Sequence, residues 1–118
     1  MLDREHPAQL LVIRYRQTET TSVPMGIALY IPVLESLYFR LREDYSFAHP
    51  DDFEFIAGTN TILESVANEM GARAAFLWME SSLSNKVFVE GPTDLLIADP
   101  EHTVALVYKQ TIDATSPL

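Results

Sequence analysis

The chain has 118 residues, of which 47% are hydrophobic and 21% charged, ordinary usage for a globular protein that excludes fibrous and disordered classes. The absence of cysteine excludes disulfides, zinc-thiolate sites, iron–sulfur clusters and cysteine nucleophiles. Seventeen acidic against eight basic residues give a net charge of −9, which disfavours direct binding to nucleic acid or anionic membranes.

No stretch reaches the roughly 18 consecutive apolar residues that a membrane helix needs. The opening "MLDREHPAQLL" lacks the basic-then-apolar pattern of a signal peptide. We therefore expect a cytoplasmic protein, with one domain over residues 1–118 and frayed ends at 1–8 and 113–118. It would fold alone or as a small oligomer such as a homodimer.

The first half of the chain has the alternation of β-strands. Residues 10–16 ("LLVIRYR"), 25–31 ("MGIALYI") and 37–43 ("LYFRLRE") each predict a strand, and the polar "QTETTSVP" at 17–24 predicts a loop that ends in proline. Within each strand, alternate residues share a face: Leu11, Ile13 and Tyr15; Ile27, Leu29 and Ile31; Leu37, Phe39 and Leu41. The short connections predict an antiparallel meander.

The acid-rich stretch around residue 50 has the features of a helix start. Pro50 suits the first helical position, with His49 or a neighbour as the cap, and three acids fall in the first turn, where the helix dipole favours anions: Asp51, Asp52 and Glu54. Apolar residues then recur at helical spacing as far as Gly71, a stop signal. A break at residues 58–60, followed by a capping box at 61–64, leaves open two shorter helices instead of one.

Residues 72–83 fit either a buried strand or a helix, because periodicity does not distinguish the two in so short an apolar run. Residues 85–91 predict a strand that ends at Gly91, and residues 93–98 an extended run. A further helix begins at Pro100, capped by Asp99. The whole pattern predicts an α+β fold, in which an antiparallel sheet of three to five strands is covered on one face by two or three helices.

The residues that could carry catalysis do not form a recognisable pattern. The three histidines lack the spacing of metal ligands, and the four glycines lack that of a nucleotide loop, so we expect no metal and no cofactor. The serines Ser81, Ser82 and Ser84 lie outside any nucleophile-elbow motif. A carboxylate pair could be built from the acids at 51, 52 and 54, but a helix start explains them sufficiently.

One grouping of cations exceeds this background. If the three N-terminal strands share one sheet, four arginines point away from the face that buries Leu11 and Leu37. We call this grouping the arginine face: Arg14, Arg16, Arg40 and Arg42, beside Tyr30 and Tyr38. It is either a solvated surface with internal ion pairs or a recognition surface for an anionic ligand or an acidic partner, since the guanidinium fork suits carboxylates and phosphates.

Several short motifs together resemble the bacterial domain of unknown function 3037 family. They are "VIRY", "VPMGIALYIP", "LYFRLR", "DDFEFI" and "DPEHTVALVYKQTI", spread over residues 10–112. The chain departs from the family at Pro24-Met25, where members usually carry an asparagine before the glycine. The resemblance implies a small accessory protein, encoded beside kinase-like proteins similar to the HipA toxin.

We therefore expect a non-enzymatic interaction or accessory protein with a protein partner, one candidate being a HipA-like kinase. Two alternatives stay open. The first is an acidic inhibitor that mimics nucleic acid, as some phage-encoded blockers of defence systems do. The second is a small hydrolase or ligand-binding enzyme that uses an acid from residues 51, 52 or 54.

Overall fold

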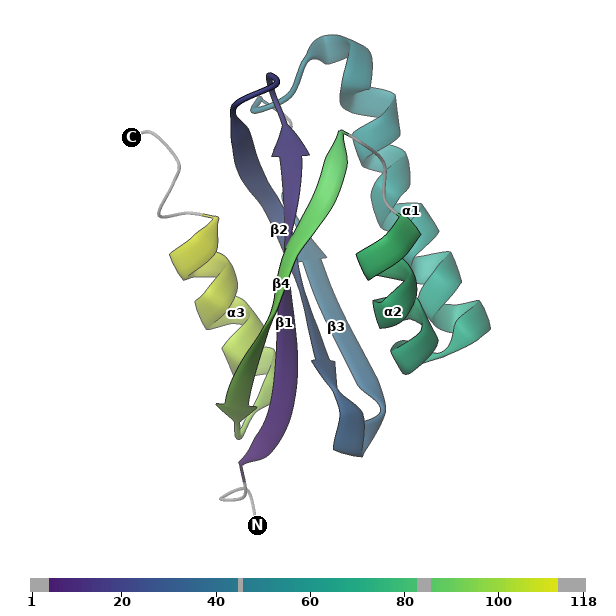
Figure 1. Cartoon of the computed structure of the whole chain (residues 1–118), viewed down its shortest axis with the longest axis vertical. Helices are drawn as coiled ribbons and strands as arrows, with labels where there is room; N and C mark the ends of the chain where they lie inside the picture. The colour runs from purple at the N-terminus through teal and green to yellow at the C-terminus, as the bar shows by residue number, and fades with distance from the viewer. Residues whose placement is uncertain (1–4, 45, 83–85, 113–118) are drawn as a thin grey trace.

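The computed structural model describes residues 5–44, 46–82 and 86–112. A four-stranded antiparallel sheet in the order β3-β2-β1-β4 is combined with three helices, which makes the fold α+β (Figure 1). The elements are β1 (His6–Arg16), β2 (Ser22–Ile31), β3 (Ser36–Leu41), α1 (Phe53–Met70), α2 (Ala72–Ser82), β4 (Val87–Ile97) and α3 (Pro100–Thr111). The expected meander of N-terminal strands is present, and β4 adds to its free side along β1.

Two strands are longer than the sequence indicated. β1 begins at His6 and buries Ala8, so residues 6–8 pair with β4 instead of fraying. β2 begins at Ser22 and contains Pro24, which was assigned to a loop. The β1 partner changes from Gly26 to Pro24 between Ile13 and Arg14, so Met25 is an extra residue, and a proline is tolerated at such a bulge.

The strand expected to end at Gly91 continues to Ile97. β4 pairs with β1 on both sides of Gly91-Pro92, and the register shifts there, so two residues of β4 stand opposite Leu11. Gly91 has φ 111°, a backbone conformation that residues other than glycine rarely adopt. A Cβ added there would lie 2.7 Å from the Leu10 carbonyl oxygen. The bulge therefore joins the two expected segments into one bent edge strand.

Helices cover both faces of the sheet, not one as expected (Figure 1). Under α1 and α2, Ala28 and Tyr30 of β2 pack with Phe76. On the other face, Leu29 and Ile31 pack toward α3. The reason is that β2 is apolar at every position from 25 to 31 and lies between two other strands, so both of its faces need cover.

The helical hairpin settles both open questions in the middle of the chain. A single 3₁₀ turn, Pro50–Asp52, leads into α1, which runs without a break through Gly58 to Met70. Gly71, with φ 86°, separates α1 from α2, so residues 72–82 are helical. α1 buries Ile56, Thr59 and Leu63 only, and it packs chiefly on α2.

The last helix starts as expected. Asp99 is its cap, and its side chain accepts a hydrogen bond from the backbone N–H of His102 at 3.2 Å. Expectations for residues 1–4 and 113–118 lie outside the described residues, as does the one for Ser84. Among the helices described, none is long and apolar enough to cross a membrane.

Candidate functional site

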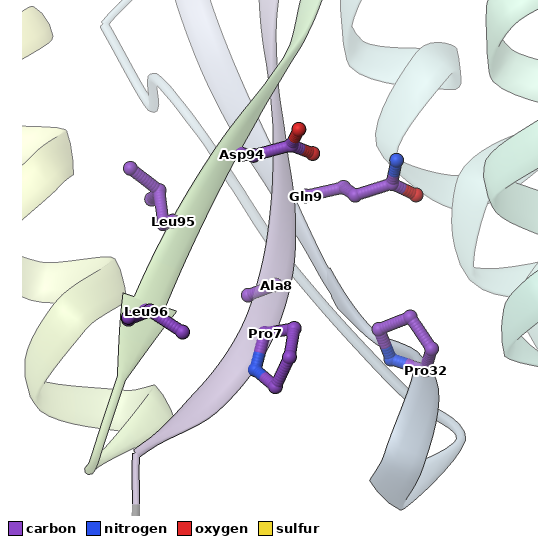
Figure 2. A pocket seen from close by; sticks show the side chains of 7 residues that line it. All are labelled: Pro7, Ala8, Gln9, Pro32, Asp94, Leu95 and Leu96. Carbon is purple, nitrogen blue, oxygen red and sulfur yellow. The ribbon is translucent and has the colours of Figure 1, made fainter.

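A hollow of about 580 Å³ lies at the end of the sheet where β1 begins and β4 ends. Figure 2 shows Gln9 and Asp94 on the same side as Pro32, with Leu95 pointing the opposite way. Asp94 is the only titratable residue in its lining. Acid/base catalysis needs a proton donor and an acceptor within reach of one substrate, so this hollow by itself offers no catalytic pair.

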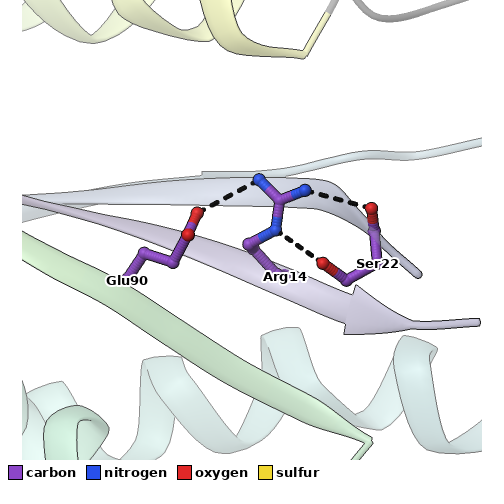
Figure 3. A network of polar contacts seen from close by, with 3 residues as sticks. All are labelled: Arg14, Ser22 and Glu90. Atoms are coloured by element: carbon purple, nitrogen blue, oxygen red, sulfur yellow. Dashed lines mark hydrogen bonds and ion pairs between the residues drawn. The ribbon is translucent and has the colours of Figure 1, made fainter. Parts of the chain in front are cut away.

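Arg14 of the arginine face is held by its own chain. Its Nε donates to the Ser22 hydroxyl at 2.9 Å, its Nη2 donates to the Ser22 carbonyl at 3.0 Å, and its Nη1 pairs with Glu90 at 3.1 Å. Figure 3 shows this network, in which the guanidinium bridges β2 and β4 across β1. Arg14 is thus paired within its own chain, as expected for a surface with internal ion pairs.

The other three arginines lie over aromatic rings. Arg16 stands 4.7 Å from the Phe88 ring centre, and Arg40 stands 4.3 Å from that of Tyr108 on α3. Arg42 lies 4.6 Å from the ring centre of Phe47. Such stacking attracts a cation to the π-face and fixes the plane of the guanidinium.

Only part of the expected arginine face is assembled. Arg14, Arg16 and Arg40 lie on the α3 side of the sheet with Tyr38, which packs beside Leu29. Tyr30 lies on the opposite side, where it is 6% exposed and stacks on Phe76 with ring centres 5.1 Å apart, so its place in the face is corrected. The reason is register. Leu29, not Tyr30, stands opposite Leu10 and Tyr38, and residues directly opposite each other point to the same face.

Arg40 and Arg42 line one hollow of about 340 Å³ between the end of β3 and α3. Its remaining walls are Leu41, Glu43, Asp44, Tyr108 and Ile112. Arg42 pairs with Asp44 at 3.7 Å, a loose contact, and the Asp44 side chain is 69% exposed. The pKa of Asp44 is lowered, first by hydrogen bonds from the Ser46 backbone and hydroxyl, so this carboxylate is engaged mainly by its own loop. We call this hollow the arginine hollow.

A second polar cluster was not predicted. The buried Tyr15 hydroxyl donates to the Asp52 carboxylate, Lys86 pairs with the same oxygen at 3.2 Å, and the His49 backbone N–H donates to Tyr15 at 3.3 Å. The inward position of Tyr15 was visible in the strand alternation. Its partners Asp52 and His49 lie 37 and 34 residues further along the chain, which no local pattern reveals.

The titration of this cluster is that of a structural network. Burial, and then the bond to Asp52, raise the pKa of Tyr15. The Tyr15 bond lowers the pKa of Asp52, and Asp52 raises that of Lys86. A general base or an activated nucleophile needs shifts toward neutral pH, and all three shifts run the other way. Asp51, another acid proposed for catalysis, contributes a smaller charge effect that also raises the pKa of Lys86.

No group of three or more histidine, aspartate or glutamate residues that could hold a metal ion occurs in the described part of the chain. His6, His49 and His102 lie on three separate elements, at the start of β1, before the 3₁₀ turn and in α3. The arginine hollow stands out by its two arginines. The cluster of Tyr15, Asp52 and Lys86, which we call the tyrosine cluster, stands out by its buried hydroxyl.

Comparison of the chain with protein-family models, curated proteins and solved structures gives no match. The resemblance to the domain of unknown function 3037 family accordingly stays a prediction.

Proposed function

We propose that this protein is a non-enzymatic interaction module that binds an acidic segment of a protein partner at the arginine hollow. The observation that carries the proposal is the placement of Arg40 and Arg42, two cations of a strongly acidic chain, in the wall of one hollow, each stacked on a ring. The tyrosine cluster is consistent with a non-enzymatic role, because the pKa shifts of Tyr15, Asp52 and Lys86 all lead away from neutral pH.

The stacking suits these arginines to carboxylates. A guanidinium carries its N–H donors in its own plane, so a ring against its flat face leaves the edges for hydrogen bonds. The aromatic contact also restricts the side chain, which reduces the conformational entropy lost on binding. A carboxylate that enters the hollow would compete with Asp44 for Arg42, and their 3.7 Å contact is a weak competitor.

The identity of the partner comes from the resemblance. A kinase-like protein similar to the HipA toxin is the first partner to test, and its binding segment would be acidic. Binding would weaken with salt, because the attraction between exposed charges is largely screened beyond about 8 Å at physiological ionic strength, and this distance shortens as salt is added.

The test is a pull-down of the tagged protein from the lysate of its own host, with and without nuclease, read by quantitative mass spectrometry. The wild type should retain one stoichiometric protein that Arg40→Gln/Arg42→Gln loses. Arg73→Gln, an exposed arginine on α2, is the matched control and should retain it. Circular dichroism and a thermal melt establish that each variant folds.

Equal recovery of the same partner by Arg40→Gln/Arg42→Gln would contradict the proposal. Capture of a nucleic-acid enzyme that the double variant still retains, and that raised salt releases, would favour the acidic inhibitor instead. Asp44→Asn provides a further check, since removing the internal competitor should tighten binding of the true partner.

A further inference from the structure

A strip of exposed apolar surface runs along one side of α1. Phe55 is 44% exposed and Ile62 is 49% exposed. Seven residues apart, they stand two turns from each other on the same side of the helix. Gly58 lies between them, three residues after Phe55 and four before Ile62. We call these three residues the α1 strip.

Gly58 has no role inside the folded chain. Its φ is not positive, and a Cβ added there would meet no atom within 4 Å, so neither backbone geometry nor packing requires glycine. Glycine in a helix interior costs about 1 kcal/mol relative to alanine. The uncompensated cost lies at the centre of the apolar strip, where the missing side chain would let another backbone approach closely.

The charged side chains of α1 are all acidic. From residue 43 to residue 72 the sequence contains no lysine and no arginine. The acids of α1 itself are Glu54, Glu64 and Glu69. Glu69 continues the spacing of Phe55 and Ile62, and Glu54 adjoins the strip, so a ligand that covers it would meet carboxylates.

We propose that the α1 strip is a docking surface for a basic amphipathic helix of a partner protein. The apolar side of that helix covers Phe55 and Ile62, its backbone or a small residue approaches Gly58, and its lysines or arginines face the acids of α1. A second copy of this chain is disfavoured, because two acidic α1 surfaces would repel each other. This surface shares no residue with the arginine hollow, so each proposal stands or fails independently.

The probe is a fluorescein-labelled peptide as long as α1, with leucine along one side of its helical wheel and lysine on the other. Two control peptides have the same composition in scrambled order, or the same leucine side with glutamate replacing lysine. Fluorescence anisotropy should give a Kd at least about tenfold lower for the amphipathic basic peptide than for either control. Equal affinity for the scrambled peptide would show charge attraction alone and overturn the proposal.

Variants place the binding on the strip. Gly58→Gln introduces a side chain into open space, so it should leave the fold intact and weaken binding at least tenfold. Phe55→Ser/Ile62→Ser should weaken binding as much. Leu106→Ser is the matched control, because Leu106 is 46% exposed on α3 and the change should not affect binding.

A loss in Leu106→Ser equal to that in Gly58→Gln would overturn the proposal. Analytical ultracentrifugation tests the remaining occupant. Self-association of the wild type that Phe55→Ser/Ile62→Ser abolishes would assign the strip to a second copy and also overturn it.

Discussion

The two faces of the sheet are covered unequally. Under α1 and α2 a cluster of eleven buried residues joins the sheet to both helices, whereas the cluster toward α3 has four. α3 itself contains no fully buried residue. The larger cluster therefore supplies most of the apolar burial, and the thinly covered face is where Arg14, Arg16 and Arg40 lie.

Thin cover is what allows charged side chains to stay on a sheet face. Arg40 lies over Tyr108 of α3, and Arg16 lies over Phe88 of β4. On this face, aromatic rings cover the arginines in place of a second helix. Buried arginines would need full pairing, and a face open at its edge avoids that cost. The comparison teaches that one face of this sheet carries most of the packing, while the other leaves room for charged side chains.

The largest expected effect is on the well-covered face. Phe76→Ala should lower the free energy of unfolding by about 3–5 kcal/mol, because it empties a fully buried site and removes the ring that stacks on Tyr30. Urea denaturation measures it. Leu77→Ala, at the neighbouring position and 52% exposed, should change stability by no more than about 0.5 kcal/mol. Similar losses in the two variants would contradict the assignment of this core.

A smaller loss is expected on the α3 side. Leu29→Ala should cost about 2–3 kcal/mol, at the low end for a buried leucine, because α3 can settle toward the gap. Hydrogen exchange should show α3 amides opening before those of β1. If α1 opened first in this variant, the idea of two separately covered faces would fail.

The link between the sheet and the start of α1 should contribute less again. Asp52→Asn should lower the free energy of unfolding by about 1–2 kcal/mol at neutral pH, because the buried Tyr15 hydroxyl loses a charged acceptor. Asp51→Asn, one residue earlier and exposed, is the control and should have little effect. Equal effects of the two changes would mean that the acids act only through the helix dipole.

The same link predicts a pH dependence. The folded pKa of Asp52 lies below its ordinary 3.8, so its ionised form stabilises the fold; that contribution is complete above pH 3.8 and is lost as pH falls through the folded value. The pKa of Tyr15 is raised above its ordinary 10.0, so its contribution to stability is complete below pH 10 and is lost as pH rises through the raised pKa. Urea unfolding from pH 2 to 7 should show wild type and Asp52→Asn converging in acid. A constant difference would contradict it.

The smallest expected effect is at the cap of α3. Asp99→Ala should cost about 1 kcal/mol, because the His102 backbone N–H loses its acceptor. A thermal melt measures the change, and Asp94→Ala, at an exposed position of β4, is the control. A larger loss than in Leu29→Ala would show that α3 depends on its cap more than on the sheet.

Local signals sufficed where one residue type has one physical role. Asp99-Pro100 marked the start of α3, and Gly71 marked the end of α1. Gly58 gave a false break, because a helix tolerates one glycine when its packed side stays intact. For the run at 72–83 the sequence left helix and strand equally open. In the structure residues 72–82 are helical, and Phe76 packs on Tyr30 of the sheet.

For the candidate site, the structure places Arg14, Arg16 and Arg40 on one face, whereas Arg42 follows the end of β3 and lies over Phe47. Alternation along β1 and β3 predicted that all four share a face. It did not predict that Tyr30 lies on the opposite face from the first three, because register depends on hydrogen bonds between strands. Nor did it reveal the arginine hollow, which needs α3 to lie beside the end of β3.

By itself, the sequence determined the α+β class, the meander and the start of α3, since alternation, proline and capping residues act within a few positions. The helix expected from Pro50 begins as a 3₁₀ turn, and α1 itself starts at Phe53. Only the tertiary structure decided that helices cover both faces, that Asp52 joins Tyr15 and Lys86, and that two arginines line one hollow. These features join residues tens of positions apart. Their energies come from packing and from pairing charges across the fold, which no local pattern encodes.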